Sequence, residues 1–172
     1  LLSDIERVLN NYVVYFRPVL KDYYGLAFLV REDIQVLEEG EVWIHHTEQT
    51  GPIANHSRNL QFIKFEKSGH HYLVCNLHGL WSENGKGDTD NRMDQSRVIQ
   101  RFVDTYPEKR ILCGDFNLRP DTESVKLIEQ SMRNLIAEYN VSTTRTKFYR
   151  KPECFSDYIF VSRDVDVQRF NV

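Results

Sequence analysis

Hydrophobic and polar residues alternate along this chain with two different periods, which separate candidate strands from candidate helices. Apolar residues three to four positions apart indicate helices. Runs rich in β-branched and aromatic residues, separated by short polar turns, indicate strands. The pattern predicts helices over 1–11, 91–106 and 121–130, and strands over 12–16, 25–30, 34–44, 60–65, 72–77, 110–113, 146–149, 158–161 and 165–172.

Strands and helices alternate in the middle of the chain, with hairpin-like pairs of strands on either side. This order favours a mixed sheet covered by helices, in the α/β or α+β class. A length of 172 residues with 41% hydrophobic residues is enough for one sizeable core, so we expect a single domain over residues 1–172. No apolar run reaches the roughly 20 residues that a membrane-spanning helix needs, so no membrane span is expected.

Charge and cysteine content narrow the possible partners and the compartment. The formal net charge is −3, which disfavours tight, non-specific coating of nucleic acid but permits a local basic groove. Cys75, Cys113 and Cys154 lie far apart in the sequence and lack zinc-site spacing. We expect reduced core thiols, a cytoplasmic location and no obligate protein partner.

The segment Gly114-Asp115-Phe116-Asn117 follows a short apolar strand directly. Polar groups at the carboxyl end of such a strand lie where α/β proteins usually bind ligands. In an extended segment, Asp115 and Asn117 would point the same way. The carboxylate of Asp115 can then accept a proton from water or bind a divalent cation, while the amide of Asn117 contacts a phosphate oxygen. An Asx turn before a helix explains the same four residues equally well.

Two further polar residues stand at strand ends. His78 closes the strand before the long helix, where its imidazole would stabilise an oxyanion, although a lone histidine is more often structural. Asp157 begins the apolar run Tyr158-Ile-Phe-Val. That acid is either a cap or a partner that orients a catalytic imidazole.

These three elements, in this order, resemble the endonuclease/exonuclease/phosphatase superfamily, whose members are deoxyribonuclease I-like. The resemblance rests on Asn76-x-His78, on Gly114-Asp115-Phe116-Asn117 with Pro120 after it, and on Asp157-Tyr158-Ile-Phe-Val-Ser162. It covers essentially the whole chain. It implies a four-layer α-β-β-α sandwich with two mixed sheets, and hydrolysis of a phosphoester with Mg²⁺ or Mn²⁺.

The resemblance also implies a role for each matching residue. Asp115 corresponds to the acid that activates water and binds the metal, and Asn117 to the residue that holds the scissile phosphate. His78 corresponds to the histidine that stabilises the phosphorane, and Asp157 to the acid that aligns a second histidine. Arg58, at a strand start, is similar to the family's phosphate-contacting arginine, although an exposed strand-end arginine explains it equally well.

The chain also departs from the family pattern. Nothing in residues 1–30 matches the family's early Asn or its metal-binding Glu, and no Ser-Asp-His element follows 165–172. We therefore expect a domain without the first strands and the last strand of the family. A divalent ion would lack a principal ligand, so we expect a metal-dependent phosphodiesterase or nuclease whose 172-residue chain is weakly active or inactive. The alternative is a non-catalytic member of the fold that acts as a binding module.

Three loops are candidates for substrate recognition: 45–57, 81–91 and 143–154. Trp81 would stack on a nucleobase or close the core. Arg145, among Lys147, Phe148 and Tyr149, would bind a phosphate backbone beside aromatic rings, or belong to a solvated strand face. The expected partner is a phosphoester substrate, with nucleic acid as one candidate.

Overall fold

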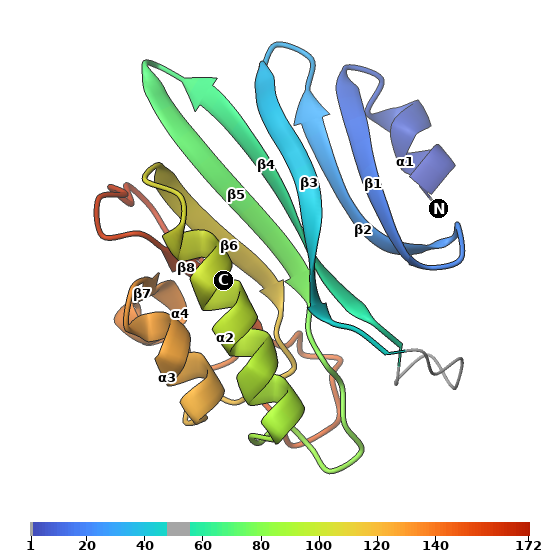
Figure 1. The fold of residues 1–172 in the computed structure, drawn as a ribbon. Coiled ribbons are helices and arrows are strands. Elements are labelled where there is room, and N and C mark those ends of the chain that lie inside the picture. Colours follow the sequence, from blue (N-terminus) through green and yellow to red (C-terminus); the bar gives the residue numbers. More distant parts are fainter. Residues whose placement is uncertain (1, 48–55) are drawn as a thin grey trace.

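The computed structural model describes residues 2–47 and 56–172 and contains strands and helices in the alternating order that the sequence predicts (Figure 1). The long helix and the paired strands in the middle of the chain agree with the predicted ranges to within a few residues. The elements are α1 (Leu2–Val8), β1 (Tyr12–Leu20), β2 (Tyr24–Arg31), β3 (Val36–His45), β4 (Arg58–Lys67), β5 (His70–His78), α2 (Asp90–Asp104), β6 (Lys109–Asp115), α3 (Glu123–Glu129), β7 (Arg133–Asn134), α4 (Leu135–Glu138) and β8 (Asp157–Val161).

The larger sheet has six strands in the order β3-β4-β5-β6-β8-β7. Strands β5 and β6 are parallel, joined by a crossover that contains α2, whereas the other neighbours are antiparallel. The hairpin of β4 and β5 turns at Ser68 and Gly69, which both have positive φ. The sheet is therefore mixed, as the order of strands and helices predicts.

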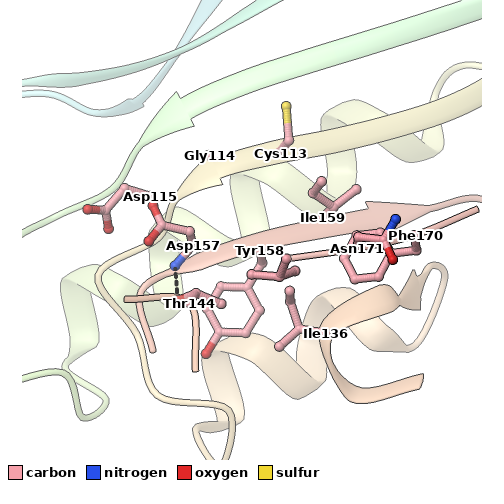
Figure 2. Close-up of a pocket in the computed structure, with 11 residues that line it drawn as sticks. Cys113, Gly114, Asp115, Ile136, Thr144, Asp157, Tyr158, Ile159, Phe170 and Asn171 are labelled. Carbon is pink, nitrogen blue, oxygen red and sulfur yellow. Dashed lines mark hydrogen bonds between the residues drawn. The ribbon is translucent and has the colours of Figure 1, made fainter. Parts of the chain in front are cut away.

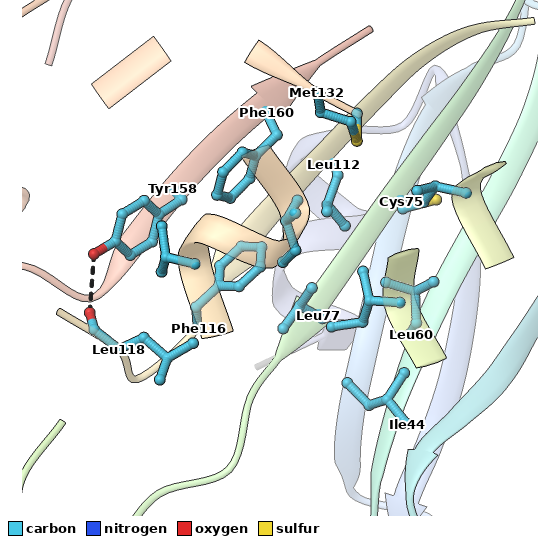
Figure 3. Close-up of a cluster of buried hydrophobic side chains, with 14 of the residues drawn as sticks. Ile44, Leu60, Cys75, Leu77, Leu112, Phe116, Leu118, Met132, Tyr158 and Phe160 are labelled. Atoms are coloured by element: carbon cyan, nitrogen blue, oxygen red, sulfur yellow. Dashed lines mark hydrogen bonds between the residues drawn. The ribbon is translucent and has the colours of Figure 1, made fainter. Parts of the chain in front are cut away.

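One face of this sheet packs against α2 and α3 and forms the hydrophobic core (Figure 3). Side chains alternate between the faces of a strand, so every second residue of β4, β5, β6 and β8 contributes to this face. Leu60, Leu77, Leu112 and Phe160 are at most 1% exposed. Each such side chain contributes about 1.5–3 kcal/mol by its removal from water. This core fixes the strand ends from which the polar residues emerge.

The opposite face of the sheet meets the hairpin of β1 and β2, which forms a second, antiparallel sheet. The amide of Gln61 on β4 donates to the carbonyl of Tyr15 at 2.7 Å. Arg17 of the hairpin pairs with Glu39 on β3. Figure 1 shows α1 beside β1, away from α2 and α3. The α/β class with two sheets is therefore confirmed, the smaller sheet being a purely antiparallel pair.

Two predicted strands are wrong. Residues 146–149 form a turn in which the Tyr149 amide donates to the Thr146 carbonyl at 3.0 Å. Residues 165–172 contain no strand, and Phe170 instead packs against Tyr139 with ring centroids 5.1 Å apart. Both segments have the composition of strands, but the described residues include no neighbouring strand that pairs with either one.

No helix among the described residues is both long enough and apolar enough to cross a membrane, and the longest, α2, has 15 residues.

Candidate active site

Strand register brings three of the predicted site residues into one row across the larger sheet. His78 on β5 lies opposite Asp115 on β6, and Asp115 lies opposite Asp157 on β8. Directly paired residues on neighbouring strands project from the same face. An imidazole and two carboxylates from distant parts of the sequence therefore meet on the face opposite the helices, at the carboxyl end of β6. This set is called the His-Asp-Asp row below.

Asp115 is held in place by groups that donate to one of its oxygens. Oδ1 accepts a hydrogen bond from the backbone N–H of Asn117 at 2.8 Å and another from the Ser156 hydroxyl. The preceding Gly114 has a φ of +140°, and a Cβ there would lie 2.1 Å from the Leu77 carbonyl oxygen. Only glycine fits this position. The strand therefore presents the carboxylate in a fixed orientation, with Oδ2 directed towards Arg145.

Arg145 links the two carboxylates of the row. Its Nη2 lies 4.0 Å from Asp115 Oδ2, and its Nη1 lies 3.5 Å from Asp157 Oδ2. Burial raises the pKa of Asp157, the charge of Asp115 adds to that increase, and Arg145 opposes it. Two neighbouring carboxyl groups in different environments are suited to different protonation roles. The surroundings of Asp115 differ from those of Asp157, because its Oδ1 accepts two hydrogen bonds.

His78 lies near the hydroxyl of Tyr24, the guanidinium group of Arg58 and the carboxylate of Asp115. The hydroxyl of Tyr24 on β2 lies 3.1 Å from His78 Nδ1, so the smaller sheet contacts the row directly. Burial lowers the pKa of His78, the charge of Arg58 lowers it further, and Asp115 opposes both. The ring is therefore neutral at pH 7. When Tyr24 donates to Nδ1, the ring proton is on Nε2 and is available to a ligand.

Lys86 is a member of the site that the sequence did not single out. Its side chain is 7% exposed, and its Nζ donates to the Phe155 carbonyl at 2.9 Å. Burial lowers the pKa of Lys86 and Arg145 lowers it further, while Asp115 and Asp157 raise it. A lysine in a polar loop between glycines has no pattern that marks it as buried. Only the fold brings its ammonium group close to the two carboxylates.

Asn117 does not extend alongside Asp115 as the sequence predicts. Strand β6 ends at Asp115, and Asn117 has a φ of +54°, in the left-handed region. Its side-chain Nδ2 donates to the Gly79 carbonyl at 3.2 Å, and the residue is 4% exposed. The extended geometry is therefore wrong, because the chain turns immediately after the strand. The assignment of Asn117 to the scissile phosphate stays a prediction.

The two remaining predicted residues, Arg58 and Trp81, differ in burial. Arg58, the first residue of β4, is 3% exposed, and its Nε has no hydrogen-bond partner among the described residues. The exposed strand-end alternative is therefore wrong for Arg58. Trp81 is 41% exposed, so it does not close the core. Of the loop 45–57, residues 48–55 lie outside the described residues.

The row borders an apolar pocket of about 360 Å³ on the same face of the sheet. Figure 2 shows Asp115, Asp157 and Thr144 at one end of this pocket and Phe170 and Asn171 at the other. Cys113 and Ile159, the next residues on this face, form part of its wall. A polar row thus meets an apolar cavity, a common setting for a ligand site.

Comparison with known families identifies the group to which this chain belongs. Residues 2–172 match the model of the Endonuclease/Exonuclease/phosphatase family. The chain belongs to this family. A search of curated proteins found no match.

Several solved structures have the same fold. A mannosyl-6-phosphatase from Bacteroides thetaiotaomicron superposes with a TM-score of 0.74 at 22% identity, covering 95% of this chain and 67% of that chain. TDP2 of D. rerio, complexed with a single-strand DNA product, superposes with a TM-score of 0.72 at 18% identity, covering 94% and 66%. Another endonuclease/exonuclease/phosphatase family protein from B. thetaiotaomicron gives 0.75 at 21%, covering 94% and 63%. This chain thus spans about two-thirds of the length of these proteins.

The side chains of the row do not by themselves complete the divalent-cation site expected from the family. Mg²⁺ prefers several oxygen ligands in near-octahedral geometry. Asp115 and Asp157 offer carboxylate oxygens, but the guanidinium group of Arg145 lies against both. Within residues 2–47 and 56–172, no three His, Cys, Asp or Glu side chains are grouped as metal ligands. The described residues therefore do not fit Mg²⁺ or Mn²⁺ unaided, and the chemistry of the row is derived from its own side chains.

His56 lies beside the His-Asp-Asp row and makes the stability of the folded chain sensitive to acid. It is 4% exposed, neither ring nitrogen has a hydrogen-bond partner among the described residues, and its ring meets Tyr24 edge-on with centroids 5.0 Å apart. Burial lowers the pKa of His56 to about 4 from 6.5, and Arg58 and His78 contribute. As the pH falls, His56 therefore takes up a proton in the unfolded chain before it does so in the folded chain. The free energy of unfolding keeps its full value above about pH 6.5 and decreases as the pH drops towards 4.

Replacing His56 with Phe is expected to reduce this loss of stability in acid. The phenyl ring retains the edge contact with Tyr24 but cannot take up a proton. Urea unfolding at pH 7 and at pH 5 measures the effect, and His70→Gln on the exposed start of β5 is the control. Equal acid sensitivity in the His56→Phe variant and the original chain would show that His56 is not responsible.

Proposed function

We propose that this chain is a phosphoester hydrolase, a phosphodiesterase or nuclease, whose reaction takes place at the His-Asp-Asp row. The single observation that supports this most strongly is the register that aligns His78, Asp115 and Asp157 on neighbouring strands. Membership of the family supports the reaction class. When water attacks phosphorus, one group must accept a proton from the water and another must donate a hydrogen bond to the developing oxyanion. The row provides both groups.

Each side chain of the row has a distinct task in this proposal. Asp115 Oδ2 accepts a hydrogen bond from the attacking water and orients it towards phosphorus. His78, neutral and with its proton on Nε2, donates to a phosphoryl oxygen as charge develops there. Arg145 and Lys86 offset the negative charge that a phosphate brings close to two carboxylates. Asp157, with its raised pKa, is the member of the pair that more readily holds a proton.

Dependence on Mg²⁺ or Mn²⁺ is part of the proposal, supported by family membership and not by the described ligand set. Turnover by this chain is expected to be slow, because no three His, Cys, Asp or Glu side chains of the described residues are grouped as metal ligands. Titration calorimetry with Mn²⁺ tests the point independently of turnover. Heat that disappears in an Asp115→Asn variant supports metal binding at the row, and heat unaffected by the variant contradicts it.

The alternative function is a non-catalytic binding module on the same fold. The ion pairs of Arg145 with both carboxylates favour this reading, because they occupy the oxygens that catalysis needs. A binding module would hold a phosphoester ligand without hydrolysing it. Binding and turnover must therefore be measured on the same protein.

Replacing His78 with Ala is expected to lower the hydrolysis of bis(4-nitrophenyl) phosphate by about 10²-fold, because the oxyanion loses a donor. His71→Ala is the matched control, since His71 is on the same strand but 50% exposed at its side chain. Release of 4-nitrophenolate is followed with Mg²⁺ or Mn²⁺ present. Turnover that His78→Ala leaves unchanged would contradict the proposed site, and ligand binding without any turnover would favour the binding module.

A further inference from the structure

A second pocket lies between the loop after β5 and the segment before β8. Its volume is about 260 Å³. Trp81, Glu83 and Lys86 line it from the first loop, and Tyr149, Lys151 and Glu153 from the second segment. The side chains include two aromatic rings, two ammonium groups and two carboxylates. It is therefore a mixed aromatic and polar cavity, unlike the apolar one beside Ile159, and is called the Trp81 pocket below.

Lys86 and Arg145 connect the Trp81 pocket to the His-Asp-Asp row. Lys86 lines the pocket, and its ammonium group experiences the charges of Asp115 and Asp157. On the other wall, the Tyr149 ring stacks under the guanidinium group of Arg145 at 4.8 Å. Arg145 in turn reaches Asp157 at 3.5 Å. A group attached to a phosphate at the row would therefore extend over Lys86 and Tyr149 into the pocket.

The wall that presents Trp81 is held rigidly by α2. Arg92 donates to the carbonyls of Leu80, Gly85 and Gly87 at 2.6–3.2 Å. Leu80, next to Trp81, is 8% exposed, and its amide donates to Gln95 at 2.9 Å. Trp81 is nevertheless 41% exposed. A large ring on a fixed backbone, left open to solvent beside a cavity, is ready to stack against a ligand without the loss of loop entropy.

We propose that the Trp81 pocket binds the nucleobase of a nucleotide-type phosphoester whose phosphate lies at the His-Asp-Asp row. This inference rests on the proposed function for the position of the phosphate. The faces of Trp81 and Tyr149 suit a flat heteroaromatic ring. Glu153 accepts hydrogen bonds from exocyclic amino groups, and Lys151 donates to carbonyl or ring-nitrogen acceptors, as base edges require. The net charge of −3 favours a mononucleotide or a single-stranded end over a duplex.

The test measures binding and needs no turnover. The chain has two tryptophans, so a Trp43→Phe background makes Trp81 the only indole reporter. Adenosine 5′-monophosphate is titrated against ribose 5-phosphate, mannose 6-phosphate and inorganic phosphate, with quenching of Trp81 and calorimetric Kd as readouts. We expect the nucleotide to quench Trp81 and to bind about 5- to 100-fold more tightly than ribose 5-phosphate.

Two variants separate base stacking from phosphate binding. Trp81→Ala, read by calorimetry, is expected to remove the preference for the nucleotide while leaving the affinity for inorganic phosphate within about twofold. Tyr149→Ala is expected to weaken the preference, whereas Phe148→Ala, which alters a neighbouring ring that is 73% exposed, is not. Equal binding of nucleotide and sugar phosphates, or tighter binding of mannose 6-phosphate, would overturn the inference. Nucleotide binding without turnover would support it and contradict only the hydrolase function.

Discussion

Replacing Asp115 with Asn is expected to lower phosphoester hydrolysis by about 10²- to 10⁴-fold, the largest effect on activity that we predict. The amide is nearly the same size as the carboxylate but cannot accept a proton from water at neutral pH. Oδ1 already accepts hydrogen bonds from the backbone N–H of Asn117 at 2.8 Å and from the Ser156 hydroxyl, so the substitution removes the proton acceptor at Oδ2. The measurement is the initial rate of bis(4-nitrophenyl) phosphate hydrolysis at pH 7.

Asp121→Asn is the matched control for this substitution. Asp121 follows the same strand but is 71% exposed and pairs only with Arg119 among the described residues. Its replacement should leave the rate within about twofold, since exposed pairs contribute about 0–1 kcal/mol. Thermal unfolding of both variants excludes a folding defect as the cause. A folded Asp115→Asn variant with the original rate would show that the row is not the reaction centre.

Replacing Arg92 with Met is expected to reduce the free energy of unfolding by about 3–5 kcal/mol, the largest effect on stability that we predict. Arg92 is 2% exposed, and its guanidinium group donates to three backbone carbonyls of the loop after β5. Met fills much of the same volume but leaves those carbonyls without partners, and each buried orphan costs about 1–3 kcal/mol. For a chain of this size the melting temperature should fall by about 6–20 °C.

Arg97→Met, on the exposed side of the same helix, is the control for Arg92→Met. Arg97 makes one surface ion pair with Asp94, and its side chain is 48% exposed. Its loss should change the free energy of unfolding by less than about 1 kcal/mol. Equal effects of the two substitutions in urea titrations would show that the carbonyl contacts of Arg92 do not stabilise the loop.

Most of the regular elements could be predicted because their signals are local. The paired runs at 60–65 and 72–77 alternate in hydrophobicity around a polar turn, and the structure contains them as β4 and β5. Helix α2 is marked by the spacing of its apolar residues, and the side chain of Thr89 caps its first turn. The apolar spacing and the capping residue of a helix are both contained in one short segment, so that segment alone is enough to predict the helix.

The predictions failed where a segment needs a partner from elsewhere in the chain. Residues 165–172 have strand composition, but a strand exists only when its backbone groups pair with a neighbour. Arg145 was expected either on a solvated strand face or against a phosphate backbone. It lies on no strand and pairs with Asp115 and Asp157, so the strand-face alternative is wrong, while the phosphate contact stays a prediction. Cys154 was expected in the core and is exposed. In each case the local sequence leaves the surroundings of the residue open.

The sequence by itself determined the family-like order of motifs, the class of fold and the positions of His78, Asp115 and Asp157 at strand ends. These features follow from the spacing of apolar residues and from the chemistry of the side chains, and neither depends on contacts between distant parts of the chain. Only the tertiary structure decided that the three side chains form one row, because strand register depends on pairing between distant segments. It also decided the burial of Lys86 and the left-handed turn at Asn117, since burial and backbone reversal depend on what packs around each residue.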